Sequence, residues 1–164
     1  MNDVTIIDAD PRHLDALVEF NTAMALETEH KVLDGLVLRA GIARLLGDAM
    51  LGRYIIAERR SESVGAAGLT EIAGALMLTT EWSDWRNGMF WWIQSVYVRP
   101  AFRRTGVYRA LHEHVRRRAR AEPHVCGIRL YVERENIVAQ RTYLAMGMTE
   151  TVYRLYEELL PDVA

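Results

Sequence analysis

A short basic loop with one glycine joins a strand-like stretch to a helix-like stretch in the second half of the chain. The loop contains Arg103, Arg104, Thr105 and Gly106, and apolar residues at helical spacing begin directly afterwards at Val107. At such a junction, the N–H groups of the first helical turn and the positive end of the helix dipole converge. The arginines can add charge-assisted hydrogen bonds, and glycine lets the backbone approach a ligand closely. We therefore predict a phosphate-binding loop.

A second pair of chemically capable residues lies further downstream. Asn136 begins a helix-like stretch, and Tyr143 follows two helical turns later, so both face the same side of the helix. A phenol is neutral at pH 7 yet acidic enough to share its proton with a departing thiolate, which makes Tyr143 a candidate general acid. An aromatic residue at helical spacing is also typical of a core, so the residues alone leave both interpretations open.

The two stretches together resemble the GNAT superfamily of N-acetyltransferases. Residues 103–108 resemble its acyl-CoA pyrophosphate loop, usually written Q/R-x-x-G-x-G/A, except at Tyr108, where the family has a small residue. The Tyr108 ring either crowds the pyrophosphate or packs beside it. The family's second motif, N-x-x-A-x-x-x-Y-x-x-x-G-[F/M], is matched at every position by Asn136, Ala139, Tyr143, Gly147 and Met148.

The resemblance implies a mixed α/β (α+β) fold with three layers, in which a mixed, mostly antiparallel sheet of about six strands is flanked by about four helices. It implies acetyl-CoA as cosubstrate, no metal, direct attack by an amine, and Tyr143 as the acid that protonates the CoA thiolate. In relatives, the main chain of the central strand pairs with the pantetheine arm. The implied cofactor-binding residues are Val96, Tyr97, Val98, Arg103, Arg104, Thr105, Gly106, Val107, Tyr108, Asn136 and Tyr143.

The general base is less well defined, because the central strand lacks the carboxylate that many relatives carry there. We predict Glu81, in the turn just before that strand, as the base. Asp84, Glu27 and an ordered water remain alternatives. A non-catalytic acyl-CoA-binding module, in which Tyr108 and the missing carboxylate mark lost chemistry, is the competing function.

All four tryptophans fall between residues 82 and 92, where they form either a core or the wall of an acceptor pocket. The acids near this region outnumber its one arginine, Arg86, and favour a cationic acceptor: Glu27, Glu29, Glu81 and Asp84. We therefore predict a small-molecule primary amine as the acceptor, bound by Glu27, Trp82 and Trp92.

Composition places limits on the other classes of partner. The 164 residues suit one domain spanning 1–164, and the net charge of −2 implies no strong polyanion partner. We read the arginines of 116–120 as a solvated helix end and predict no nucleic-acid binding. The lone cysteine, Cys126, is predicted to be a buried strand residue, and no apolar run is long enough to cross a membrane, so we expect a cytoplasmic protein. Homodimers are common in the family and are an expectation here.

Periodicity and capping residues predict the order β-α-α-β-β-β-α-β-α-β. The predicted elements are a strand at 4–8, helices from Asp10-Pro11 to about 27 and from Asp34 to 47, strands at 53–58, 72–79 and about 90–98, a helix from 107 to about 120, a strand at 125–132, a helix between 136 and 147, and a last strand at 149–159. Residues 61–68 are predicted to be a hairpin loop, and the three middle strands an antiparallel meander.

Overall fold

The computed structural model describes residues 4–60 and 70–160, so the predicted hairpin loop at 61–68 lies outside the described residues. The chain divides into two compact units, residues 1–131 and residues 132–164. Among the described residues, none of the helices has both the length and the apolar character needed to span a bilayer.

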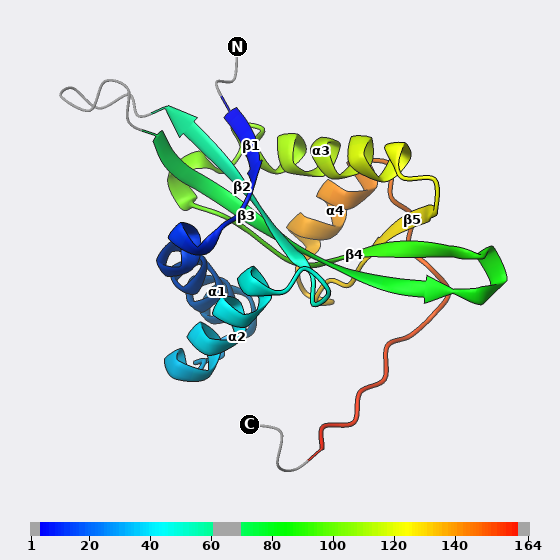
Figure 1. The fold of residues 1–164 in the computed structure, drawn as a ribbon, viewed down its shortest axis with the longest axis horizontal. Coiled ribbons are helices and arrows are strands. Elements are labelled where there is room, and N and C mark those ends of the chain that lie inside the picture. Colours follow the sequence, from blue (N-terminus) through cyan, green and yellow to red (C-terminus); the bar gives the residue numbers. More distant parts are fainter. Residues whose placement is uncertain (1–3, 61–69, 161–164) are drawn as a thin grey trace. The chain divides into compact units, whose positions relative to one another are not determined.

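The first unit is built on a five-stranded sheet (Figure 1). Its spatial order follows the chain: β1 (Val4–Asp8), β2 (Arg53–Arg60), β3 (Thr70–Ser83), β4 (Gly88–Val98) and β5 (Val125–Leu130). The first four strands pair antiparallel, and β5 pairs parallel with β4. This arrangement confirms the predicted mixed, mostly antiparallel sheet and the antiparallel meander, with five strands described.

Helices cover both faces of this sheet and complete three layers. Helix α3 (Val107–Ala121) buries Leu111 and Val115 against Ile55, Leu76 and Ile93 on one face. The other face is covered by α1 (Leu14–Glu29) and α2 (Gly35–Gly47). Leu17 and Phe20 of α1 and Ile42 of α2 pack there against Tyr54 and Ile56 of β2 and Ala75 of β3. Since successive strand residues point to opposite faces, a continuous apolar run such as that of β2 can serve both cores.

The predicted helix starts are confirmed by side-chain caps. The Asp34 carboxylate accepts hydrogen bonds from the N–H groups of Leu36 (2.8 Å) and Val37 (3.1 Å). Asp10 precedes a short 3-10 helix, Pro11–His13, that leads into α1, and its carboxylate accepts from the Arg12 N–H at 2.9 Å. Each cap satisfies donors that have no partner inside the helix.

β3 is longer than its sequence pattern predicted, which corrects the position of Glu81. We placed Glu81 in a turn, but β3 continues to Ser83, and the turn itself is the 3-10 segment Asp84–Arg86 followed by Asn87 at φ 44°. Glu81 pairs with Phe90 in the β3–β4 ladder. Its carboxylate is therefore carried by a paired strand, which positions it more firmly than a turn would.

The second unit contains α4 (Ile137–Ala145), and Gly147 at φ 85° follows its end. The predicted last strand at 149–159 is wrong, because these residues have no regular secondary structure. Residues such as Val152 and Tyr153 favour an extended backbone, but a strand also requires a hydrogen-bonded neighbour. The burial of Cys126 was also predicted wrongly: its side chain is exposed on β5, the last strand in the order of the sheet.

Two glycines allow a matched test of the packing between β3 and β4. A Cβ atom on Gly74 would lie 2.7 Å from the Tyr97 carbonyl oxygen, which is backbone and cannot move aside, whereas a Cβ on Gly41 in α2 meets nothing within 4 Å. We expect Gly74→Ala to lower the free energy of unfolding by about 1–3 kcal/mol. Gly41→Ala should raise it by about 0.5–1 kcal/mol. Urea denaturation measures both, and an unchanged midpoint for Gly74→Ala would contradict the close approach.

His112 predicts a pH-dependent stability. The residue is 2% exposed, and neither ring nitrogen has a hydrogen-bond partner among the described residues. Burial lowers the pKa of His112, the charge of Arg116 lowers it further, and Glu113 acts in the opposite direction. As the pH falls through 6.5, His112 is protonated more readily in the unfolded chain than in the folded one. The free energy of unfolding therefore falls as the pH drops below that value.

Replacing this ring should reduce that dependence, and His114, whose pKa is lowered by burial and by Arg118 and Arg117, should retain part of it. We expect His112→Leu to raise the free energy of unfolding by about 1 kcal/mol at pH 5.5, since an unsatisfied polar group is removed from the interior. Urea denaturation between pH 5 and pH 8 measures the effect, with the exposed residue His124 changed to Gln as the control. A pH slope that is the same in His112→Leu and the unchanged protein would contradict the assignment.

Candidate active site

β4 separates from β5 halfway along its length. The two strands are paired from Met89 to Ile93, and no β5 residue is paired with β4 beyond that point. The register against β3 also shifts here: Ile93 lies opposite Leu78 and Ser95 opposite Met77, so Gln94 is an extra residue on β4. A bulge of this kind bends a strand and re-aims its side chains. The last part of β4 therefore has one edge that β5 does not cover.

The main-chain groups of Val96 and Val98 face this open edge. The N–H of Arg99 donates to the Ala73 carbonyl of β3 at 2.9 Å, so the alternation of the strand directs Val96 and Val98 to the opposite side. The Val98 carbonyl accepts a hydrogen bond from Arg103 Nε at 2.9 Å, which agrees with that direction. These are the positions at which main-chain pairing with pantetheine was predicted.

The predicted phosphate loop turns tightly into α3. Arg104 (φ 65°) and Gly106 (φ 90°) both adopt left-handed backbone conformations, and the Thr105 hydroxyl donates to the Phe102 carbonyl at 2.8 Å. A φ of 90° suits glycine and strains other residues. Helical geometry leaves the N–H groups of the first turn, which starts at Val107, without acceptors inside the helix. The loop thus has the backbone geometry of an anion site.

Tyr108 lies along the helix. Its ring centroid is 5.8 Å from that of His112, one turn further into α3, and the side chain is half-buried. A tyrosine that packs against the next turn leaves the start of the helix uncovered by its ring. Of the two alternatives that the sequence left open, this geometry corresponds to packing beside the loop.

Arg103, Glu27 and Tyr97 form one cluster between the predicted phosphate loop, the end of α1 and β4. Arg103 Nη2 lies 2.5 Å from Glu27 Oε2, and the Tyr97 hydroxyl donates to Glu27 Oε1 at 3.0 Å. The guanidinium also lies over the Tyr97 ring, 5.5 Å from its centroid. Burial raises the pKa of Tyr97, as do the hydrogen bond and the charge of Glu27. Two donors of Arg103, Nε and Nη2, are thus engaged within the chain.

Glu81 belongs to a second cluster that includes an arginine we did not predict. Arg129 Nη1 lies 2.9 Å and 3.1 Å from the two Glu81 oxygens, and Trp92 Nε1 donates to Glu81 Oε2. Arg129 stands opposite Trp92 in the β4–β5 ladder and stacks over the Phe90 ring, 3.6 Å from its centroid. The predicted acceptor residue Trp82 is 56% exposed on β3. No local pattern could indicate Arg129, because strand pairing alone brings it to Glu81.

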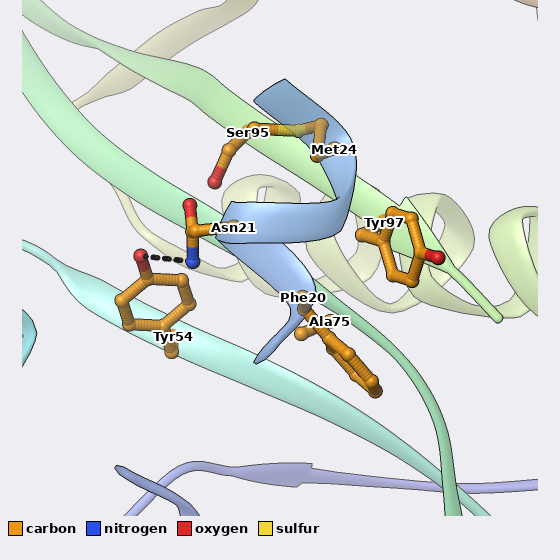
Figure 2. Close-up of a pocket in the computed structure, with 7 residues that line it drawn as sticks. All are labelled: Phe20, Asn21, Met24, Tyr54, Ala75, Ser95 and Tyr97. Carbon is orange, nitrogen blue, oxygen red and sulfur yellow. Dashed lines mark hydrogen bonds between the residues drawn. The ribbon is translucent and has the colours of Figure 1, made fainter. Parts of the chain in front are cut away.

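A small cavity lies where α1 meets β2, β3 and β4 (Figure 2). Its volume is about 10 Å³, and its lining residues are Phe20, Asn21, Met24, Tyr54, Ala75, Ser95 and Tyr97. The Asn21 amide donates to the Leu17 carbonyl (2.8 Å) and to the Tyr54 hydroxyl (3.1 Å). Burial raises the pKa of Tyr54, and its hydrogen bonds with Asn21 and Ser95 offset part of that shift.

Sequence reasoning missed this cavity, although Asn21 carried a signal. It interrupts the apolar face of α1, and a polar residue at such a position needs a partner inside the fold. That partner, Tyr54, is 33 positions away in the sequence.

In the second unit, Asn136 and Tyr143 occupy the start and the body of α4. The Asn136 side chain accepts a hydrogen bond from the Ala139 N–H at 3.1 Å and so caps the helix as predicted. Tyr143 is half-buried, and burial raises the pKa of its phenol. The phenol therefore keeps its proton throughout the neutral pH range, as a general acid must.

The family model described as "Acetyltransferase (GNAT) family" matches residues 32–148. The chain belongs to the GNAT acetyltransferase family. A solved structure of a possible acetyltransferase from Clostridium difficile 630 is 39% identical, covers 96% of this chain and 98% of its own, and has a TM-score of 0.83. No curated protein matched the chain.

More distant GNAT structures share the fold. An aminoglycoside N-acetyltransferase in complex with CoA is 16% identical, with a TM-score of 0.71 and coverage of 95% of this chain and 94% of its own. An aminoglycoside acetyltransferase from an uncultured soil metagenomic sample, in complex with sisomicin, is 15% identical, with a TM-score of 0.70 and coverage of 97% and 98%.

Within the first unit of this GNAT protein, the open edge of β4 comes shortly before the predicted phosphate loop in the chain. Two of the four acids that we predicted for the acceptor or the base are paired with arginines, Glu27 with Arg103 and Glu81 with Arg129. The acidic surface predicted from the sequence is therefore neutralised at these two positions.

Proposed function

We propose that this GNAT protein is an N-acetyltransferase that transfers the acetyl group of acetyl-CoA to a primary amine of a small molecule. The observation that supports it is the separation of β4 from β5 after Ile93. β5 therefore does not pair with the main chain of Val96 and Val98, which comes immediately before a loop and helix start suited to a diphosphate. A bound acetyl-CoA would supply an activated acyl group as its thioester.

The residues of the first unit fit that cosubstrate in three places. The main chain at Val96 and Val98 can pair with the amides of the pantetheine arm, and the loop from Arg103 to Tyr108 can hold the diphosphate. A backbone N–H of β4 near the bulge can stabilise the negative charge that develops on the acyl oxygen as the amine attacks. Tyr143, matched to the family's acid, holds the proton that the departing sulfur requires.

Removal of a proton from the amine has two candidate routes. Glu81 is the proposed base, but both of its oxygens already accept hydrogen bonds, so it must give up a contact with Arg129 or Trp92 to act. An ordered water is the alternative. If Glu81 is the base, Glu81→Gln should lower kcat by about 10²–10⁴. An unchanged kcat assigns the step to water.

Release of free thiol from acetyl-CoA, followed with and without a panel of primary amines, tests the proposed activity. We expect amine-dependent, multiple-turnover thiol release and an acetylated amine product of the corresponding mass. Binding of acetyl-CoA without amine-dependent release would instead identify the non-catalytic acyl-CoA-binding module. The two distant aminoglycoside acetyltransferases support the fold, and their substrates do not identify the acceptor of this protein.

A further inference from the structure

The cavity beside the bulge of β4 has polar groups but no formal charge. Its polar lining consists of the Asn21 amide and the hydroxyls of Tyr54 and Ser95, which point toward one another in Figure 2. Phe20, Met24, Ala75 and Tyr97 line the rest. A volume of about 10 Å³ accommodates one group of the size of a water molecule or an amino group. The site can therefore hold the amino group of an acceptor, while the rest of the acceptor must lie outside the cavity.

The position of this cavity ties it to the predicted site of acyl transfer. Ser95 lines the cavity and directly follows Gln94, the extra residue of the bulge. Val96, the next residue, directs its main chain to the open edge of β4. Two consecutive residues of β4 therefore line the cavity and form part of the open edge, respectively.

The surrounding charges argue against a polycation. Arg103 neutralises Glu27, and Arg129 neutralises Glu81, so two of the four acids expected to favour a cationic acceptor are engaged within the chain. A partly buried site without a carboxylate disfavours the charged form of a bound amine. The neutral form, which it favours, is the nucleophile.

We propose that the cavity formed by Asn21, Tyr54 and Ser95 holds the amino group of the acceptor, and that the acceptor carries a single amino group. This inference rests on the proposed function. The Asn21 carbonyl oxygen and the Ser95 hydroxyl accept hydrogen bonds from the amine and leave its lone pair for attack. Transfer forms the N–C bond with that lone pair, and the electrons of the broken C–S bond leave on sulfur. The nitrogen loses one proton and the sulfur gains one.

A matched pair of acceptors tests the substrate class. Hexylamine and 1,6-diaminohexane have the same chain length and differ only in the second amino group, and 2-phenylethylamine and spermidine extend the comparison. We expect kcat/KM for hexylamine to exceed that for the diamine by at least about tenfold. Turnover confined to the diamine and spermidine would overturn this inference and leave the acetyltransferase assignment intact. Absence of turnover with every amine, despite acetyl-CoA binding, would overturn both.

Two conservative variants test the location. Tyr54→Phe and Ser95→Ala each remove only a hydroxyl group, and each should raise the KM for hexylamine by about tenfold. Each should also weaken hexylamine binding, measured calorimetrically in the presence of CoA, to the same extent, while the affinity for acetyl-CoA stays within about twofold. Thr22→Ala, an exposed hydroxyl on α1 beside Asn21, is the control. Unchanged KM and unchanged hexylamine binding in both variants would place the amine elsewhere.

Discussion

Gly106→Asp should abolish acetyl-CoA binding, with calorimetric affinity at least about 100-fold weaker than in the unchanged protein. Gly106 has a φ of 90°, which an aspartate adopts only with strain, so the loop that directs N–H groups from the start of α3 is distorted. The new carboxylate also adds a negative charge where the diphosphate would lie. Strain and repulsion act in the same direction, which makes this the largest binding effect that we expect.

Gly41→Asp is the matched control, since it makes the same chemical change at an exposed position of α2 where a Cβ meets nothing within 4 Å. We expect this variant to bind acetyl-CoA normally. If Gly106→Asp is folded by circular dichroism and still binds within about threefold of the unchanged protein, the loop does not hold the diphosphate.

Tyr143→Phe should lower kcat by about 10²–10⁴ while the affinity for acetyl-CoA changes little. The substitution removes one hydroxyl from α4 and keeps the ring, so packing is retained and the proton for the leaving sulfur is lost. Because burial raises the pKa of Tyr143, the acid form persists above the usual phenol value of 10.0, and any loss of kcat due to its ionisation should occur above that pH. Thiol release in single and multiple turnovers measures the effect.

Tyr153→Phe is the control for this substitution, because Tyr153 is 73% exposed and lies outside the matched motif. We expect it to leave kcat unchanged. A Tyr143→Phe enzyme with full kcat and an unshifted alkaline limb would show that water protonates the sulfur, and Tyr143 would then be a packing residue of α4.

Most elements of the fold could be predicted because their signals are local. Asp34 caps a helix three residues away, and Gly106 marks a left-handed turn by its own conformational freedom. The prediction of a last strand was wrong because it used the same local signals. Residues 149–159 have the local preference for a strand, but strand pairing depends on a neighbour that no local pattern specifies. Glu81 was misplaced because the end of β3 depends on its ladder with β4.

The sequence by itself determined the order of the elements as far as α4, the left-handed turn before α3, the helix caps and the GNAT motifs, since each depends on residues within one or two turns of one another. Only the tertiary structure decided the charge and shape of the candidate acceptor site. Arg103 meets Glu27 across 76 positions, and Arg129 meets Glu81 across 48. The Asn21–Tyr54 contact spans 33. These contacts depend on strand register, on the bulge at Gln94 and on helix packing, which are set by the fold as a whole.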